Sequence, residues 1–398
     1  MKLKVLELFG GIGACSKALK RLGIDYEVAD YVEIDKYAVA SYNAINGTNF
    51  EPQDICEWNK DIEVDLIMHG SPCQDFSLAG RQAGGDEGSG TRSSLMYETI
   101  RIVEKTRPKY VIWENVKNVI SKKHIHNFNN YITRMSELGY ISYYQVLNAK
   151  DYGIPQNRER VFTISIRDDT KVYGDYFFPT IEPDVKAINF SFPQKQELKL
   201  KLKDMLEDKV DEKYYLSEKM VEYISADNEK WTGNNKEALI NKDIATTINT
   251  GEGHRRCDAS NYISNDVGSN YNLKIKNNTK KGYLEAYEGD GVDISGRMQY
   301  HRGNVQKQMI QTLNTNQDYG VVTKDLRIRK LTPKECWRLM GFDDEDYDKA
   351  SKVNSNTQLY KQTGNSIVVN VLEAILTNLL LEPKKEVLEG QLSIYDLN

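Results

Sequence analysis

A single cysteine in a short turn motif is the residue of this chain best suited to covalent chemistry. Residues 70–77 read Gly-Ser-Pro-Cys-Gln-Asp-Phe-Ser and follow an apolar run, Val64–Met68, that has the length of a buried strand. Gly70 and Pro72 end that strand and place Cys73 on a constrained turn. A thiol there can act as a nucleophile if its surroundings favour the thiolate, whereas the more ordinary role of a free cysteine is that of a small buried apolar residue.

One carboxylate and two arginines could act together with this thiol. Glu114 follows a second apolar run, Tyr110–Trp113, and a carboxylate at the end of a parallel strand lies in the ligand crevice of its sheet. The alternative for Glu114 is an acid that stabilises a helix N-terminus. Alternation in the stretch Gln-Asn-Arg-Glu-Arg puts Arg158 and Arg160 on one face with Gln156, where two guanidinium groups could hold an anion or lower a thiol pKa. The alternative is a charged edge strand, although unpaired arginines beside a core would be costly.

A glycine-rich turn indicates a ligand site near the N-terminus. Residues Phe9–Gly13 read Phe-Gly-Gly-Ile-Gly between an expected strand and an expected helix, so that backbone N–H groups could face a ligand closely. Alone this would be only a tight strand-to-helix turn. Glu33 ends the next strand roughly 20 residues later, where an acid commonly binds ribose hydroxyls. Asp54 and Ile55 stand where a third strand should end and could hold an adenine edge, which together predicts an adenosine-containing cofactor without a phosphate-binding motif.

These residues require a sheet that brings strand ends together. Residues 1–165 alternate strand-like and helix-like segments, the pattern of a doubly wound parallel sheet. The last two strands are expected to form an antiparallel pair. The expected strands are Lys4–Leu8, Tyr26–Val32, Val64–Met68, Tyr110–Trp113, Tyr143–Leu147 and Val161–Ile166, and the expected helices are Ala14–Leu22, Asp35–Ile45, Leu95–Lys105 and Phe128–Leu138.

The composition changes after about residue 170. Residues 170–325 are rich in Asn, Lys, Thr, Gly and Tyr and predict a smaller, irregular domain of loops and short strands. Regular patterning returns in two helices, Leu331–Met340 and Ser366–Leu381, and the second is expected to pack on the first domain. The predicted organisation is therefore a catalytic domain at 1–169, the irregular domain at 170–325, a returning segment at 326–382 and a flexible tail at 383–398.

The overall composition is that of a globular protein with room for two domains. The chain has 398 residues, of which 39% are apolar and 28% charged, with a net charge of −5 and a mean hydropathy of −0.61. The sequence contains no long apolar run, which argues against a membrane span. The N-terminus lacks the apolar core of a signal peptide, so export is not expected. Five dispersed cysteines without a Cys-x-x-Cys pair argue against a zinc site or a disulfide framework and fit the reducing cytoplasm. An acidic protein can still carry a basic groove for nucleic acid.

Six motifs in one order give the chain a resemblance to the cytosine-C5 DNA methyltransferases. Glu7 stands where that family usually has Asp, and Gly10 where it often has Ala. The resemblance covers residues 3–165 and 326–380. The motifs are Leu6–Gly13, Ser71–Gln74, Glu114–Val116, Gln156–Arg160, Arg329–Phe342 and Gly364–Asn370.

This resemblance implies a fold and a reaction. The fold would be a Rossmann-like, mostly parallel doubly wound sheet of the class I methyltransferase type, with a loop-rich target-recognition domain. The enzyme would move a methyl group from S-adenosylmethionine to C5 of a flipped-out cytosine in a specific duplex DNA sequence, without a metal. Cys73 would add to C6, Glu114 would hold or protonate N3, and Arg158 and Arg160 would favour the thiolate.

The resemblance also assigns the binding residues. The loop Ser77–Ser94 would close over the base, and residues 170–325 would recognise the target, with lysines 274, 276, 280 and 281 for the backbone and His254, Arg255, Arg256 or Arg297 for guanine edges. The cofactor would be bound by Phe9, Gly11, Gly13, Glu33, Ile34, Asp54, Ile55, Pro72, Asn365 and Ser366, and DNA by Gln74, Ser77, Arg81, Arg92 and Gln156.

The tail and the competing functions complete the sequence-based predictions. Gln391–Tyr395 resembles the pentapeptide by which bacterial proteins dock on the replicative sliding clamp, and the alternative is a tail that packs on the body. A monomer is expected. The competing functions are an RNA cytosine methyltransferase, which normally has a smaller insert than 170–325, and a non-catalytic DNA-binding relative, which would be expected to lose Cys73 or Glu114. A dinucleotide oxidoreductase is disfavoured because the Gly-x-Gly-x-x-Gly pattern is missing.

Overall fold

The computed structural model describes residues 2–72, 86, 88–168, 190–217, 272–295, 303–314, 318–323, 327–381 and 392–393. The chain forms two compact units. The first consists of Met1–Val210, Gln308–Asp318 and Leu331–Asn398, and the second of Asp211–Lys307 and Tyr319–Lys330. The described residues 190–210 and 308–314 therefore belong to the first unit, although the composition placed them in the irregular domain.

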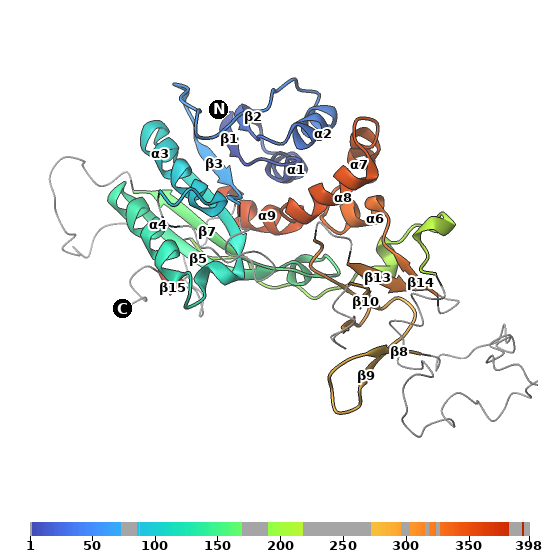
Figure 1. The fold of residues 1–398 in the computed structure, drawn as a ribbon. Coiled ribbons are helices and arrows are strands. Elements are labelled where there is room, and N and C mark those ends of the chain that lie inside the picture. Colours follow the sequence, from blue (N-terminus) through green and yellow to red (C-terminus); the bar gives the residue numbers. More distant parts are fainter. Residues whose placement is uncertain are drawn as a thin grey trace, which may run out of the picture. The chain divides into compact units, whose positions relative to one another are not determined.

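A seven-stranded sheet forms the centre of the first unit, in the order β15-β5-β7-β4-β3-β1-β2 (Figure 1). The strands β1 to β4 are parallel, and β7 runs antiparallel to both β4 and β5. This mixed but mainly parallel sheet confirms the predicted Rossmann-like class. The strands are β1 (Leu3–Leu8), β2 (Tyr26–Val32), β3 (Leu66–His69), β4 (Tyr110–Val116), β5 (Tyr140–Asn148), β7 (Glu159–Arg167) and β15 (Leu392–Ser393).

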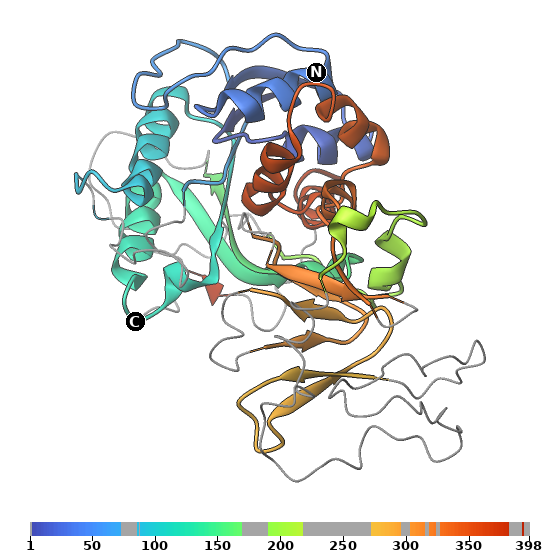
Figure 2. The same cartoon turned by 45° about the vertical axis from the view of Figure 1, so that its right-hand side comes forward.

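Helices cover both faces of this sheet, as Figure 2 shows. On one face lie α3 (Met96–Thr106) and α4 (Ile125–Glu137), whose apolar residues at helical spacing enter the main core cluster. On the other face, α1 (Ala14–Arg21) packs against the C-terminal helix α9 (Val369–Leu376). The helix α2 (Lys36–Asn46) begins at Asp35, whose side chain accepts the backbone N–H of Tyr37.

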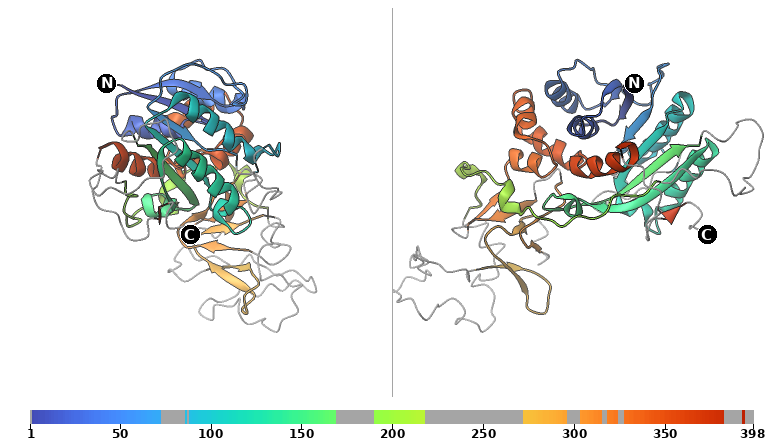
Figure 3. Two further views of the ribbon diagram at one scale, coloured as in Figure 1. Left: turned by 90° about the vertical axis from the view of Figure 1, so that its left-hand side faces the viewer. Right: turned by 180° about the vertical axis from the view of Figure 1, so that it is seen from behind.

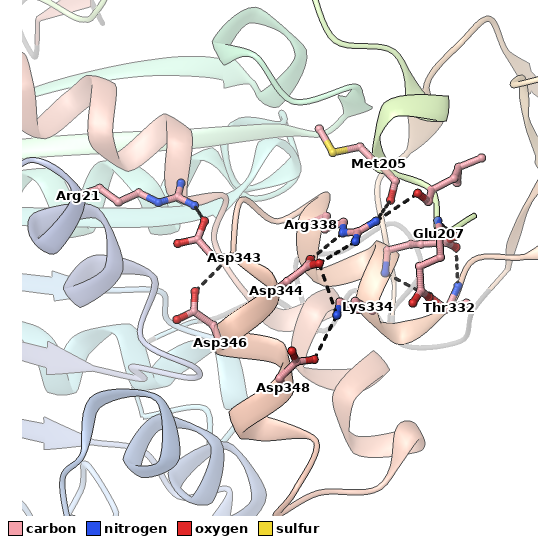
Figure 4. Close-up of polar contacts among 12 residues, drawn as sticks. Arg21, Met205, Glu207, Thr332, Lys334, Arg338, Asp343, Asp344, Asp346 and Asp348 are labelled. Carbon is pink, nitrogen blue, oxygen red and sulfur yellow. Dashed lines mark hydrogen bonds and ion pairs between the residues drawn. The ribbon is translucent and has the colours of Figure 1, made fainter. Parts of the chain in front are cut away.

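The C-terminal segment returns to this unit through four helices. They are α6 (Pro333–Arg338), α7 (Asp344–Ala350), α8 (Asn356–Asn365) and α9, followed by a π-helical turn at Thr377–Leu381. A capping box between Thr332 and Glu335 starts α6. Lys17 of α1 forms ion pairs with Asp343 at 2.5 Å and Asp346 at 2.6 Å. Arg21 also pairs with Asp343, as Figure 4 shows. These contacts fix the helix that follows the glycine-rich turn against α7.

Within the described residues, Asn356–Leu381 is a helical stretch long and apolar enough to be a candidate membrane span. By length and composition this stretch could cross a membrane, with a mean hydropathy of 1.5 in its most apolar window, although polar residues interrupt it throughout. Half of that window is buried inside the fold, and the core helix of a soluble protein has the same composition. The stretch is not one continuous helix, because Ser366 between α8 and α9 has extended backbone angles.

Short strands make up the second unit. A four-stranded sheet has the order β11-β10-β13-β14, and a separate hairpin pairs β8 with β9. Its small core contains Ile275, Val292 and Ile328. The bounds are β8 (Leu273–Lys276), β9 (Tyr283–Ala286), β10 (Gly291–Asp293), β11 (Val305–Gln306), β13 (Tyr319–Val322) and β14 (Ile328–Lys330).

Two small pairings complete the first unit. The strand β6 (Gln156–Asn157) pairs in parallel with β12 (Ile310–Gln311). The strand β15 extends the central sheet at its β5 edge, with Leu392 opposite Tyr144 and Ser393 opposite Tyr143 (Figure 3).

Candidate active site

The end of β3 lies beside Glu114. A Cβ atom built on Gly70 would be 3.7 Å from Oε2 of Glu114 and 3.4 Å from Cδ1 of Ile367. The structure describes Gly70, Ser71 and Pro72, so the chain that enters the cysteine turn passes the predicted acid. Other predicted site residues lie outside the described residues, namely Cys73, Gln74, Ser77 and Arg81, with most of the predicted closing loop.

Glu114 is a buried carboxylate that faces an arginine. Its exposed fraction is 8%, and Nε of Arg160 lies 3.0 Å from its Oε1. The angle between the Arg160 N–H and Oε1 is unfavourable, so Oε1 accepts no hydrogen bond and the contact is an ion pair only. Burial raises the pKa of Glu114 above its ordinary value, although the positive charges of Arg160 and Arg158 act in the opposite direction. Glu114 is therefore able to carry a proton that it can donate.

The strand position also decides between the two interpretations of Glu114. β4 continues to Val116, two residues beyond Glu114, and the 3₁₀ turn Lys117–Ile120 begins only after it. Glu114 is paired with Phe162 of β7 in the ladder. It is thus a strand residue and not a helix-terminal acid.

The two arginines have different surroundings. Arg158 is 3% exposed, and its guanidinium donates to the backbone oxygens of Leu313 at 3.1 Å, Gly364 at 3.2 Å and Ser366 at 2.7 Å. The strands β6 and β7 are interrupted at Arg158, so the expected alternation with Arg160 breaks there. Arg160 faces Glu114, whereas Arg158 connects this strand to the C-terminal motif.

Gln156 has a structural role in place of the predicted DNA contact. Its side chain is fully buried, with Nε2 donating to the oxygen of Leu339 at 2.8 Å and Oε1 accepting the N–H of Leu313 at 3.1 Å. The position of Gln156 therefore does not support a direct DNA contact. Arg92 is exposed at the start of a 3₁₀ turn, Arg92–Leu95, as a phosphate contact would require.

The glycine-rich turn is joined to the end of β2 by Glu33. Oε2 of Glu33 accepts the N–H of Gly11 at 3.2 Å, and Oε1 accepts the N–H of Asp35 at 2.9 Å. Burial raises the pKa of Glu33, and these N–H groups act against that rise. Gly13 has φ of 85°, and a Cβ there would meet the Tyr42 ring at 2.8 Å, so no other residue fits. Phe9 itself adopts a positive φ of 53°, a strained conformation typical of functional turns.

Further predicted cofactor residues gather at the same sheet edge. Ile34 is 67% exposed directly after Glu33, an unusual position for a large apolar side chain. Asp54 is exposed, whereas Ile55 is 4% exposed and can offer only its backbone to a ligand. Oδ1 of Asp54 accepts the N–H of Cys56 at 2.9 Å.

The final motif is fixed to this edge by α8. Lys361 forms an ion pair with Asp35 at 2.7 Å, and Nε2 of Gln362 donates to the oxygen of Tyr37 at 3.0 Å. Asn365 is exposed at the end of the same helix, and Ser366 is buried as its C-cap. The two distant segments that were predicted to bind the cofactor therefore lie next to each other.

Sequence reasoning gave no role to Glu7. This carboxylate is 1% exposed at the end of β1, and its Oε1 accepts the hydroxyls of Ser16 and, at 3.2 Å, Tyr42. Burial raises the pKa of Glu7 to about 7. The sequence feature that could have identified Glu7 is an acidic residue within the otherwise apolar run Val5–Leu8.

The lysines predicted to contact the DNA backbone lie on the hairpin of the second unit. Lys274, Lys276, Lys280 and Lys281 belong to β8 and the turn that follows, and Lys281 pairs with Glu285 at 2.6 Å. The predicted guanine-reading residues His254, Arg255, Arg256 and Arg297 lie outside the described residues. Within the described part of the chain, no group of three or more His, Cys, Asp or Glu side chains could hold a metal ion.

Comparison with known proteins gives a consistent result. A family model for the C-5 cytosine-specific DNA methylases matches residues 3–380. The orphan methyltransferase M.SPRI of Bacillus phage SPR is 33% identical, with 95% of this chain and 98% of that protein covered. The type II methyltransferase M.HhaI of Haemophilus parahaemolyticus is 30% identical, with 95% and 94% covered.

Solved structures show the same fold. A Spodoptera frugiperda DNMT2 mutant matches with a TM-score of 0.56 and 20% identity, covering 95% of this chain and 99% of that one. A putative DNA modification methyltransferase encoded in an Escherichia coli prophage matches with a TM-score of 0.52 and 19% identity, covering 95% and 98%.

Proposed function

Because the chain belongs to the C-5 cytosine-specific DNA methylase family and is a DNA cytosine-5-methyltransferase, we propose that it methylates a flipped-out cytosine by covalent catalysis through Cys73. The observation that supports this most directly is the position of Glu114, a buried carboxyl of raised pKa beside the chain that leads into Cys73. A thiol and a proton donor on neighbouring strand ends are the two groups that activation of cytosine requires.

The proposed chemistry begins with addition of the Cys73 thiolate to C6 of the base. The S–C6 bond forms, the electrons of the C5–C6 double bond move into the C4–C5 bond, those of the C4–N3 double bond move onto N3, and the proton of Glu114 neutralises the charge at N3. C5 is then nucleophilic enough to take the methyl group, and S-adenosylhomocysteine would be the leaving group. A base, for which water suffices, would take the C5 proton, the C5–C6 double bond re-forms as the Cys73 sulfur leaves, and N3 returns its proton to Glu114. Arg160 keeps the Glu114 carboxyl in place, and the positive charges of Arg158 and Arg160 would favour the thiolate.

S-adenosylmethionine supplies the methyl group as an electrophilic sulfonium. The residues at the ends of β1 and β2 fit this donor, since Glu33 offers carboxylate oxygens for ribose hydroxyls and Ile34 offers an exposed apolar surface for an adenine ring. The glycine-rich turn allows close approach of the backbone. Asn365 and Ser366 would complete the site from the C-terminal segment.

We propose DNA contacts for two regions of the sequence. Bases in a duplex are stacked, so the target cytosine must leave the helix before Cys73 can reach it, as is general for DNA methyltransferases. Arg92 would contact the backbone, and the loop Ser77–Ser94 would close over the base. Residues 170–325 would select the sequence, with the β8–β9 hairpin supplying lysines for phosphates.

The decisive experiment substitutes the thiol. Cys73→Ala should abolish methyl transfer to duplex DNA and covalent trapping on DNA that contains 5-fluorocytosine, because the C6 adduct cannot form. The matched control is Cys56→Ala, which removes an exposed thiol and should keep the wild-type trapping yield. Trapping that survives in Cys73→Ala would refute the mechanism. Transfer to transfer RNA in place of DNA would favour the competing RNA enzyme.

The target sequence can be read in the same programme. Some relatives are named orphan methyltransferases and others type II methyltransferases, and we expect this enzyme likewise to modify one short sequence. Bisulfite sequencing of DNA from a host that expresses the protein would show that sequence as a uniform set of protected cytosines. Protection scattered over unrelated contexts would contradict sequence-specific recognition.

The tail is proposed to dock on the replicative sliding clamp through Gln391–Tyr395. Leu392 and Ser393 lie against β5 as strand β15, so docking in a peptide groove requires this strand to leave the sheet. Purified clamp should retain the full chain and not a chain lacking residues 391–398. Equal retention of both would remove the proposal and leave β15 as a structural edge strand. We further expect a cytoplasmic monomer, which size-exclusion chromatography with light scattering would test.

A further inference from the structure

Both neighbours of Glu114 bind the residue that leads into the cysteine turn. Nε1 of Trp113 donates to Oγ of Ser71 at 2.9 Å, and Nδ2 of Asn115 lies 3.2 Å from the same Oγ and 3.3 Å from the Ser71 oxygen. Side chains alternate along β4, so Trp113 and Asn115 point to one face of the strand while Glu114 points to the other. Ser71 is 3% exposed, so water does not compete for these bonds.

The indole ring is held in a buried aromatic cluster and therefore gives its N–H a fixed direction. Trp113 is 1% exposed, with ring-centroid distances of 4.2 Å to Tyr131, 5.7 Å to Phe128 and 5.9 Å to His69. His69, the last residue of β3, is bonded to the Tyr131 hydroxyl at 2.9 Å. Interlocked rings of this kind allow little rotation, and they link His69 of β3 to Trp113 of β4.

We propose that Trp113 and Ser71 are positioning residues for methyl transfer: the indole N–H holds the Ser71 hydroxyl, and so fixes the turn that leads into Cys73 relative to Glu114. The inference rests on the proposed function, because it assumes that Cys73 and Glu114 act on the same ring. Addition at C6 and proton donation at N3 must be satisfied together, and a misplacement of 1 Å costs on the order of 100-fold in rate. Ser71 is connected to Cys73 through Pro72 alone, a residue with a fixed φ, so the chain between them transmits position well.

The test removes each partner of the bond while it keeps the packing. Trp113→Phe keeps an aromatic ring without the N–H donor, and Ser71→Ala removes the acceptor. We expect either change to slow covalent trapping on DNA containing 5-fluorocytosine by roughly 10- to 100-fold, with KM for S-adenosylmethionine within about twofold of wild type. The matched control is Tyr140→Phe, which deletes another buried hydrogen bond of this unit, to the oxygen of Pro108 at 2.6 Å. It should lower Tm to a similar extent and leave the trapping rate unchanged.

A double mutant and a conservative variant separate positioning from general damage. Because both single changes break the same contact, Ser71→Ala with Trp113→Phe should be no slower than the slower single variant. Ser71→Thr keeps a hydroxyl and should recover most of the rate. Single variants that trap at the wild-type rate, or losses that multiply in the double mutant, would overturn the inference. If the wild-type enzyme itself does not trap, the proposed function fails instead.

Discussion

Two glutamates at the same edge of the central sheet are stabilised in opposite ways. Glu33 at the end of β2 has each oxygen bonded to a neutral backbone N–H, from Gly11 and Asp35. Glu114 in β4 faces the cation of Arg160, and its Oε1 lacks a hydrogen bond. Burial raises the pKa of both, yet only Glu33 has its orientation set by the backbone on two sides.

This difference separates binding from proton transfer within one sheet edge. A carboxylate held by backbone N–H groups is a preorganised acceptor, suited to hydroxyls of a ligand that does not change its protonation. A buried carboxyl with one oxygen left without a hydrogen bond can exchange a proton with a base ring, and the nearby arginine limits how far its pKa rises. The comparison predicts that changes at the two glutamates affect different kinetic constants.

The largest effect is expected at Glu114. Glu114→Gln keeps the shape but removes the proton donor for N3, so kcat should fall by about 10²- to 10⁴-fold, with KM for S-adenosylmethionine nearly unchanged. Steady-state methyl transfer to duplex DNA, with the donor varied, measures both constants. A variant that retains a tenth of the wild-type kcat would contradict proton donation by Glu114 and would make the two glutamates equivalent.

A smaller effect is expected from the cation beside Glu114. In Arg160→Met the carboxyl loses the charge that lowers its pKa, so Glu114 should stay protonated to higher pH. The alkaline limb of the kcat profile should therefore move toward higher pH, while kcat at neutral pH falls roughly tenfold because the carboxyl is less well held. Arg160→Lys keeps the charge and serves as the control. A limb that moves to lower pH, or does not move, would show that Arg160 does not tune Glu114.

Much of the framework around these glutamates could be predicted from apolar periodicity. The strand Tyr26–Val32 was predicted with its observed bounds, and the expected Lys4–Leu8 differs from β1 by one residue. β4 was expected to end at Trp113 because the apolar run stops there, but its ladder with β7 continues through Val116. Backbone hydrogen bonds do not depend on side-chain polarity, so β4 continues beyond the end of its apolar run.

The partners of the site residues could not be predicted, because they are distant in sequence. Spacing placed Arg158 and Arg160 together, but Oδ1 of Asn148 accepts the N–H of Arg158 at 3.1 Å and the strand is interrupted there. The bonds of Gln156 reach across more than 150 residues, to Leu313 and Leu339. The local sequence pattern predicts which strand or turn carries a residue, but it does not determine hydrogen bonds between residues that are distant in the sequence.

The proposed role of Glu33 in binding S-adenosylmethionine is tested by substituting this residue. Glu33→Gln replaces one acceptor oxygen by an amide that points at an N–H donor, either that of Gly11 or that of Asp35. KM for S-adenosylmethionine should rise by about tenfold, in line with the loss of a hydrogen bond to a charged group, while kcat at saturating donor stays within about twofold. Glu114→Gln measured in parallel should show the opposite division. A fall in kcat alone would place Glu33 in the chemistry and abolish the distinction.

The smallest effect on turnover is expected at Glu7, which is buried beneath the same glycine-rich turn and should report on stability. Its pKa of about 7 in the folded chain exceeds the ordinary carboxyl value of 4.5, so between these pH values the folded state binds a proton that the unfolded state lacks. The free energy of unfolding should therefore decrease as pH rises from 4.5 to 7, by on the order of 3 kcal/mol from this group, and stay level above pH 7.

The variant Glu7→Gln lacks this contribution. The difference in unfolding free energy between wild type and Glu7→Gln should therefore shrink between pH 4.5 and 7, and denaturant titration at several pH values measures it. A difference that is constant with pH would show that Glu7 titrates normally and that the buried hydroxyls of Ser16 and Tyr42 hold it as a carboxylate.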